Sequence, residues 1–177
     1  MNKPRKYWVA VTATAALFAA GWACKKDVSQ QDESLPLLSA IAVGQPRAER
    51  QLVDGFWAVE NNAWRWTKHN FSVRLMPPPD AMQKGATLDF RFTLPDTVIV
   101  RRKSVTLSVS AGDVPLPPAT YTAAGDYSYK SPVPVTAFKA GEPVKIVFST
   151  DQFLAAGEVD ARELALVSHS FALVPNK

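Results

Sequence analysis

The stretch Leu88-Asp89-Phe90-Arg91-Phe92-Thr93-Leu94 decides the predicted fold, because apolar and polar side chains alternate along it without interruption. Successive side chains of an extended strand point to opposite faces, so this alternation provides one face for a core and one for water. Shorter stretches with the same period occur at residues 71–75, 105–109 and 144–148. One-sided strands of this kind are typical of antiparallel sheets. The sequence therefore predicts an all-β domain at residues 51–177, built as an antiparallel β-sandwich.

Turn-forming residues separate these stretches at short intervals. Proline, glycine and aspartate gather at residues 77–80, 95–96, 112–113, 125–126 and 141–143, and such clusters end strands. We expect strands at about 53–60, 63–67, 70–76, 86–94, 97–101, 104–111, 119–123, 126–130, 134–138, 143–149 and 163–174, some of them merged. No stretch after Gln51 keeps a helical period long enough to predict a helix. Two packed sheets fit better than a closed barrel, because prolines such as Pro132 and Pro134 are tolerated at sheet edges and corners.

The N-terminus has the pattern of an export signal. Lys3, Arg5 and Lys6 precede an uncharged, alanine-rich stretch that ends at Ala23 and Cys24. A basic start, an apolar middle and a small residue before the cut are the marks of a signal peptide, which we place at residues 1–23. The apolar stretch is at the short limit for a membrane-spanning helix, and this disfavours a permanent transmembrane anchor.

Cys24 is the only cysteine, so the chain has no disulfide framework and no zinc site of the multi-cysteine kind. Its place at the end of the apolar stretch resembles a bacterial lipobox, whose cysteine is diacylated and becomes the new N-terminus. We therefore predict lipidation of Cys24, since two acyl chains give stable membrane anchoring. Two alternatives remain open. An ordinary signal peptidase cuts the same bond, because Gly21 and Ala23 are small, or the cysteine merely ends the apolar stretch.

Residues 24–50 are predicted to be the lipidated N-terminus and a flexible tether. Residues 25–34 are polar without a hydrophobic period, so they bury too little to fix one conformation. Residues 35–43 are more apolar and either form a short helix or lie against the domain.

Charge gives little indication of a partner once the signal is removed. The 20 basic residues fall to 17 without Lys3, Arg5 and Lys6, against 16 acidic residues, so the net charge drops from +4 to +1. We therefore expect no nucleic acid as a partner. The basic run at 101–103 is expected in a solvated loop or on an edge strand that its charge keeps from aggregating.

Four short motifs resemble a known type of module. They are Phe56-Trp57-x-x-Glu60, Trp64-Arg65-Trp66-Thr67, Phe71-x-Val73-x-Leu75 and Asp160-x-Arg162-x-Leu164. In their order and distance they resemble the jelly-roll modules found in bacterial lipoproteins and surface-polysaccharide proteins. The resemblance covers residues 52–174, and it implies a β-sandwich of the carbohydrate-binding-module type without catalysis.

Three tryptophans, Trp57, Trp64 and Trp66, lie within ten residues and form the candidate ligand site. Aromatic faces with a polar rim suit the stacking of sugar rings, and Glu60 and Arg65 are placed to supply hydrogen bonds around them. The alternative is that the tryptophans pack in the core while Arg65 points to solvent. A mixture, with Trp57 buried and one of the others exposed, is the third interpretation.

Asp160 and Arg162 are expected to form a structural ion pair that fixes a loop, with Arg162 as a buried and multiply bonded residue. No catalytic residue is predicted, because the sequence lacks the nucleophile-elbow, zinc-protease, P-loop and dinucleotide-binding motifs. His69 beside a turn and His169 in the last strand are expected to be structural. Any pair of the 16 acids remains open as an unrecognised hydrolase site. No metal or cofactor is expected.

These features predict an exported protein anchored by lipid in the bacterial cell envelope. Its sandwich is expected to be non-catalytic and to bind glycan through exposed aromatic residues. The alternative is a structural or assembly lipoprotein that contacts another envelope protein.

Overall fold

The computed structural model describes residues 35–177, and the predicted signal peptide, Cys24 and the polar part of the tether lie outside the described residues. Within residues 35–177, no helix has the length and apolar character needed to cross a membrane. The described chain is mostly β-strand, so the predicted all-β class is confirmed.

Nine strands form the domain, with short helices between them. In chain order the elements are β1 (Ala40–Ala42), the 3-10 turn η1 (Pro46–Arg50), β2 (Leu52–Phe56), β3 (Arg65–Leu75), α2 (Ala81–Lys84), β4 (Ala86–Leu94), α3 (Asp96–Arg102), β5 (Val105–Ala111), β6 (Val114–Tyr121), β7 (Gly125–Val133), the 3-10 turn η2 (Val135–Ala137), β8 (Val144–Thr150) and β9 (Val167–Pro175). Every strand pair is antiparallel.

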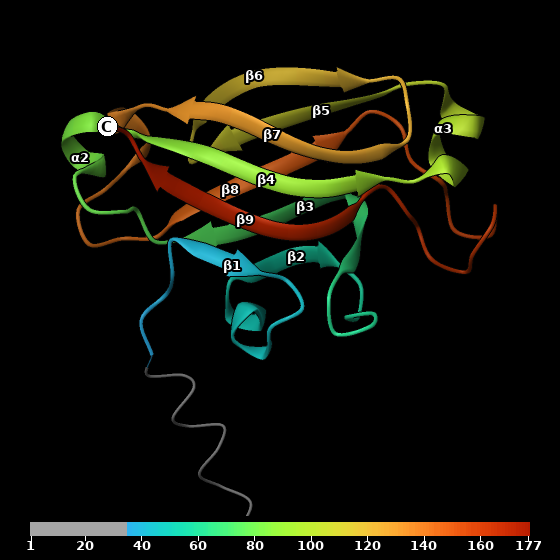
Figure 1. The fold of residues 1–177 in the computed structure, drawn as a ribbon, viewed down its shortest axis with the longest axis horizontal. Helices are drawn as coiled ribbons and strands as arrows, with labels where there is room; N and C mark the ends of the chain where they lie inside the picture. The colour runs from blue at the N-terminus through green and yellow to red at the C-terminus, as the bar shows by residue number, and fades with distance from the viewer. Residues whose placement is uncertain (1–34) are drawn as a thin grey trace, which may run out of the picture. The chain divides into compact units, whose positions relative to one another are not determined.

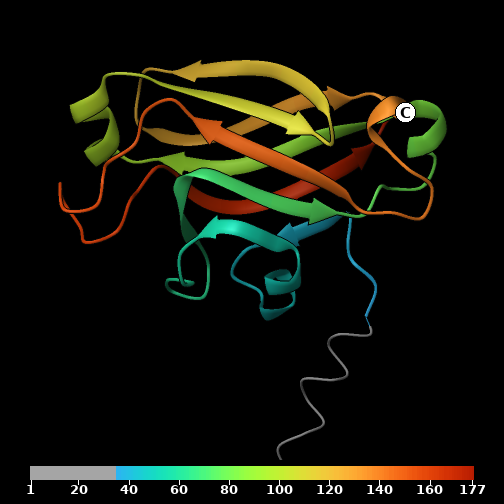
Figure 2. The ribbon, with the colours of Figure 1, turned by 180° about the vertical axis from the view of Figure 1, so that it is seen from behind.

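The strands form two packed layers that share β3. The pairing order is β6-β5-β8-β3-β9-β4-β7, with β1 also on β9 and β2 also on β3. Figure 1 shows β7, β4 and β9 in one layer, and Figure 2 shows β8, β3 and β2 from the other side. The layers join because Arg65 and Trp66 of β3 pair with β9, while residues 70–75 of the same strand pair with β8. The sheet is nearly closed, since Tyr129 of β7 donates a hydrogen bond to Pro117 O of β6 at 2.7 Å.

Phenylalanines from four strands fill the space between the layers. Phe71 stacks on its cross-strand partner Phe148 at 4.8 Å, and Phe90 stacks on its partner Phe171 at 4.5 Å. The two pairs meet across the interior, where Phe90 and Phe148 lie 4.9 Å apart and tilted. All four side chains are essentially inaccessible to solvent. This confirms the period-two pattern, because β4 buries Phe90 and exposes its neighbour Arg91.

The domain begins before residue 51, so the predicted extent of the tether is wrong for residues 35–50. Residues 40–42 pair with β9, and Ile41 and Val43 are buried. The Gln51 side chain fixes this segment by donating to Leu38 O and accepting from Leu38 N, both at 2.8 Å. The segment therefore lies against the domain as a strand, and the helix considered for it is not formed.

Two predicted strands are helical. Residues 96–102 form α3 in place of the strand predicted at 97–101, although their β-branched residues favour a strand. Pro95 begins the helix from an extended conformation, and Val98 is the one residue of α3 that is fully buried, so the segment covers the end of the sandwich instead of joining a sheet. Residues 135–137 form the turn η2 in place of the strand predicted at 134–138. The strands predicted at 63–67 and 70–76 merge into β3.

Candidate functional site

A hairpin connects β2 to β3 and carries three of the predicted ligand residues, Trp57, Glu60 and Trp64. Asn61 and Asn62 have φ values of 49° and 54°, the left-handed conformation that asparagine tolerates in turns, and Ala63 completes the turn. Glu60 and Trp64 pair across the turn, and the Glu60 N–H donates to Trp64 O at 2.9 Å. The asparagines therefore build the turn, while Glu60 and Trp64 are held opposite each other.

The three tryptophans differ in their surroundings, although each is half-buried. Trp57 and Trp66 pack against the core, whereas Trp64 is not among the residues packed there. Trp57 Nε1 donates to Glu163 O at 2.7 Å, so the indole is anchored inward. Two cations approach its ring, with Lys68 Nζ at 5.4 Å and Arg162 Cζ at 5.8 Å from the centroid. Of the three, Trp64 is thus the side chain with the most freedom to meet a ligand.

Arg65 is a buried structural residue. It does not point to solvent, and its side chain is not available to contact a ligand. Its Nε donates to Val43 O at 3.0 Å and its Nη1 donates to Trp57 O at 3.2 Å. Nη2 pairs with the carboxylate of Glu49. The guanidinium fork suits several acceptors at once. Arg65 therefore has the buried, multiply bonded role that the sequence predicted for Arg162, and it ties the N-terminal segment to the hairpin.

Asp160 and Arg162 form the expected ion pair, and Glu60 joins it. Arg162 Nη2 lies 3.0 Å from Asp160 Oδ2, and Arg162 Nη1 lies 2.8 Å from Glu60 Oε1. The hydrogen bonds from the Arg162 side chain and backbone lower the pKa of Asp160. The same carboxylates raise the pKa of Arg162. The pair therefore clamps the loop at residues 151–166 onto the hairpin, while the Arg162 side chain stays 29% exposed.

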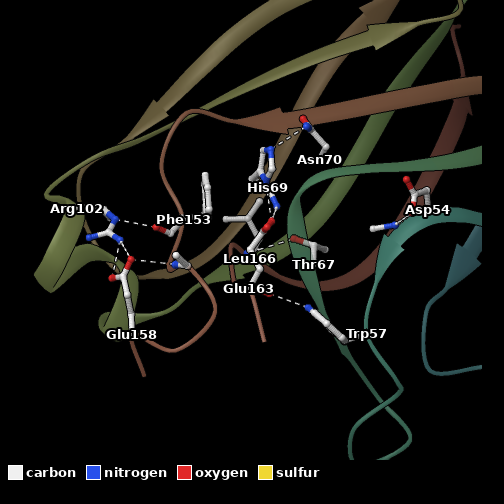
Figure 3. Close-up of polar contacts among 12 residues, drawn as sticks. Asp54, Trp57, Thr67, His69, Asn70, Arg102, Phe153, Glu158, Glu163 and Leu166 are labelled. Carbon is white, nitrogen blue, oxygen red and sulfur yellow. Dashed lines mark hydrogen bonds and ion pairs between the residues drawn. The ribbon is translucent and has the colours of Figure 1, made fainter. Parts of the chain in front are cut away.

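His69 and Glu163 form a second polar pair, which the sequence did not connect and which Figure 3 shows. Glu163 Oε1 accepts from the His69 backbone N–H at 2.7 Å and contacts His69 Nδ1 at 2.6 Å. Burial acts to raise the pKa of Glu163, but the hydrogen bonds from His69 and the charge of Lys68 outweigh it, so the pKa is lowered. Asn70 Nδ2 lies 2.9 Å from His69 Nε2.

The His69 ring is therefore held at both nitrogens. If Nδ1 carries the proton and donates to Glu163, Nε2 is free to accept from the Asn70 amide. The ring also stacks on Phe153 at 4.4 Å with 17° between the planes. No hydroxyl or thiol contacts the imidazole among the described residues. The arrangement orients the ring and gives it no nucleophile to activate.

An open groove of about 520 Å³ lies between α3 and the loop at residues 151–166, and we name it the Phe153 groove. Its lining includes Arg101, Arg102, Asp151, Gln152, Phe153 and Glu158. Arg102 Nε donates to Phe153 O at 2.7 Å, and its Nη2 pairs with Glu158. The basic run at 101–103 is thus at the end of a helix, not in the loop or edge strand expected for it.

The structure brings most of the predicted residues to one place, which we name the hairpin surface. It consists of Trp57, Glu60, Trp64, Asp160 and Arg162, connected by the contacts above. Trp66 packs against the core without the contact to Arg162 that connects Trp57, and Arg65 is buried, so neither belongs to it. Within residues 35–177, no group of three His, Cys, Asp or Glu side chains is arranged to hold a metal ion.

Comparison with protein families, with curated proteins and with solved structures finds no match to this chain. Functional inference therefore depends on the residues themselves.

Proposed function

We propose that this is an exported envelope protein anchored through lipidated Cys24, and that its sandwich is a non-catalytic module that binds glycan at the hairpin surface. The basic, apolar and small-residue pattern before Cys24 supports the anchor. Ten residues lie between Cys24 and Leu35, so the distance between these two residues is at most about 40 Å when the chain is fully extended. The domain therefore works close to the membrane surface.

The single observation that carries the glycan proposal is the position of Trp64. It is partly exposed on a tight hairpin, outside the set of residues packed on the core, and directly opposite Glu60. An aromatic ring next to a fixed carboxylate matches a sugar, whose apolar face stacks and whose hydroxyls donate hydrogen bonds. Arg162 holds the Glu60 carboxylate in place, which limits the ordering needed on binding.

A protein partner is the second candidate, and the surface gives it less support. The most exposed large apolar side chains include Met82 on α2, Val100 on α3, Val159 in the loop at residues 151–166 and Val174 on β9. They lie on separate elements, and singly exposed apolar residues are normal on soluble domains.

Cell fractionation of the Cys24→Ser variant tests the anchor. We expect the wild-type chain in the membrane fraction, labelled by a clickable palmitate analogue, and the variant unlabelled and in the soluble fraction. Membrane retention of Cys24→Ser equal to the wild type would refute lipid anchoring.

Binding to immobilised peptidoglycan and to a panel of bacterial surface polysaccharides tests the module. The lipid-anchored chain is kept in solution with a detergent that has a polyoxyethylene head group, because a detergent with a sugar head group would compete with the polysaccharide for the site. We expect the affinity of Trp64→Ala for the polysaccharide to be about tenfold weaker than that of the wild type, and the affinity of Trp64→Phe to be close to it. Stacking on an aromatic ring contributes on the order of 1 kcal/mol or more. Arg91→Ala, on the exposed face of β4, is the control. If no polysaccharide retains the wild-type chain, the glycan proposal is wrong.

A further inference from the structure

We propose that the Phe153 groove is a second sugar subsite, which takes an uncharged pyranose ring stacked on Phe153. The inference depends on the proposed glycan function, but it places a ring on a surface separate from the tryptophans and specifies the charge of that ring. Three features support it: a held aromatic floor, balanced polar walls and a link to the hairpin surface.

The floor of the groove is an aromatic ring whose position is fixed on several sides. Phe153 stacks on the His69 imidazole, which is itself held by Glu163 and Asn70. The backbone carbonyl of Phe153 accepts from Arg102 Nε at 2.7 Å. The ring packs partly against the core and remains partly exposed where it lines the groove. A flat apolar face that is already immobile costs little entropy to use as a stacking platform.

The walls of the groove carry balanced charge. Arg101 and Arg102 face Asp151 and Glu158, two cations against two anions. All four groups are engaged: Arg102 pairs with Glu158, Asp151 Oδ1 accepts from the Thr106 N–H at 2.6 Å, and Arg101 Nη1 donates to Thr97 O at 3.2 Å. A charged ligand would meet a like charge on one side of such a site. Hydroxyl groups both donate and accept, so an uncharged sugar is compatible with both kinds of wall.

Gln152 adds a group suited to hydroxyl recognition. Its side-chain amide makes no hydrogen bond to another residue within 35–177, while its neighbours Asp151 and Phe153 are both held. An amide offers two donors and an acceptor, which matches adjacent hydroxyls on a pyranose. The groove volume, about 520 Å³, is within the roughly 300–1,000 Å³ of small-ligand sites and exceeds what one sugar ring fills.

Glu163 connects this groove to the hairpin surface. Its side chain positions His69 under Phe153, and its backbone carbonyl accepts from Trp57 Nε1 at 2.7 Å. Figure 3 shows Phe153 and Trp57 on either side of Glu163. One residue thus fixes both the Phe153 ring of the groove and the Trp57 ring of the hairpin surface, which favours a ligand of several rings over a single sugar.

Titration of the full chain with defined sugars tests the inference. The probes are methyl β-glucoside and methyl β-N-acetylglucosaminide as uncharged rings, with glucuronate and glucosamine as charged rings. Saturation-transfer NMR in the same polyoxyethylene detergent reports binding. We expect transfer to the uncharged pair, a weakening of about tenfold in Phe153→Ala and a smaller weakening in Gln152→Ala, which leaves the packing of the loop untouched. Gln83→Ala on α2 is the matched control.

The outcomes separate the two proposals. If polysaccharide is retained and Trp64→Ala releases it, but Phe153→Ala and Gln152→Ala bind every probe as the wild type does, the groove is not a subsite and the proposed function stands. Equal or stronger binding of either charged ring would overturn the assignment of an uncharged sugar. If the wild-type chain binds neither polysaccharide nor probe, both proposals fail together.

Discussion

Replacing Arg65 should destabilise the domain far more than its hydrophilic character suggests. The residue is 6% exposed, and its guanidinium donates to Val43 O and Trp57 O. In Arg65→Met both carbonyls lose a charged donor, at about 1.5 kcal/mol each by the lower figure for such bonds. The ion pair with Glu49 adds under about 1 kcal/mol, because the Glu49 side chain is 59% exposed. We therefore expect a loss of about 3–4 kcal/mol in the free energy of unfolding.

Urea denaturation followed by tryptophan fluorescence measures this loss. With a slope of about 2 kcal/mol per molar urea, the midpoint of Arg65→Met should fall by about 1.5–2 M. Arg74→Met is the matched control, because Arg74 is on the same strand with its side chain exposed, and it should shift the midpoint little. Glu49→Gln should also have a small effect. A midpoint of Arg65→Met within 0.3 M of the control, about 0.6 kcal/mol, would refute the clamp.

Three further predictions concern the core, a glycine and acid. Phe90→Ala, at a fully buried ring in contact with both layers, should cost about 3–5 kcal/mol in the same urea assay. Gly55→Ala should cost about 1–3 kcal/mol, and more than Gly141→Ala, because both have positive φ but only the Cβ at residue 55 would meet Asn70 O, at 2.1 Å. The urea midpoint should be constant above pH about 5 and should fall below pH about 4. The reason is that the pKa values of Asp160 and Glu163 are lowered in the folded state. Such carboxylates contribute their full stabilisation above their unfolded pKa and lose it as the pH falls through the folded pKa. Asp160→Asn should flatten this acid dependence and lower stability at pH 7, and an unchanged pH profile would contradict the assigned pKa direction.

The strands of the core could be predicted because a strand buried on one face has apolar and polar residues in alternation, which is visible in the sequence. Phe90 and Phe92 alternate with polar neighbours, and the structure buries both. The same rule fails for residues 97–101, where β-branched residues fit a strand by propensity but Pro95 and the burial of Val98 favour a short helix at the end of the sandwich. Tertiary context overrides weak propensity there.

The polar contacts of the site could be predicted only where their partners are close in sequence. Asp160 and Arg162 are two residues apart, and their ion pair was anticipated. His69 and Glu163 are 94 residues apart, so no periodicity or spacing connects them before the fold is known. The burial of Arg65 is not predictable from the sequence for the same reason, since its acceptors Val43 and Trp57 belong to other segments.

The loop at residues 151–166 is held in one conformation by hydrogen bonds, although it forms no extended strand. Leu154 and Leu164 pair with each other through hydrogen bonds of 2.8 Å and 2.9 Å, and both side chains are buried. Glu158 accepts from the Ala155 N–H and pairs with Arg102, so the tip of the loop is held to α3. Connecting segments usually supply function by being variable on a rigid scaffold. Here the loop is fixed at its neck and its tip, so ligand groups placed on either side of it would be preorganised, and the binding energy would not be spent on ordering the chain.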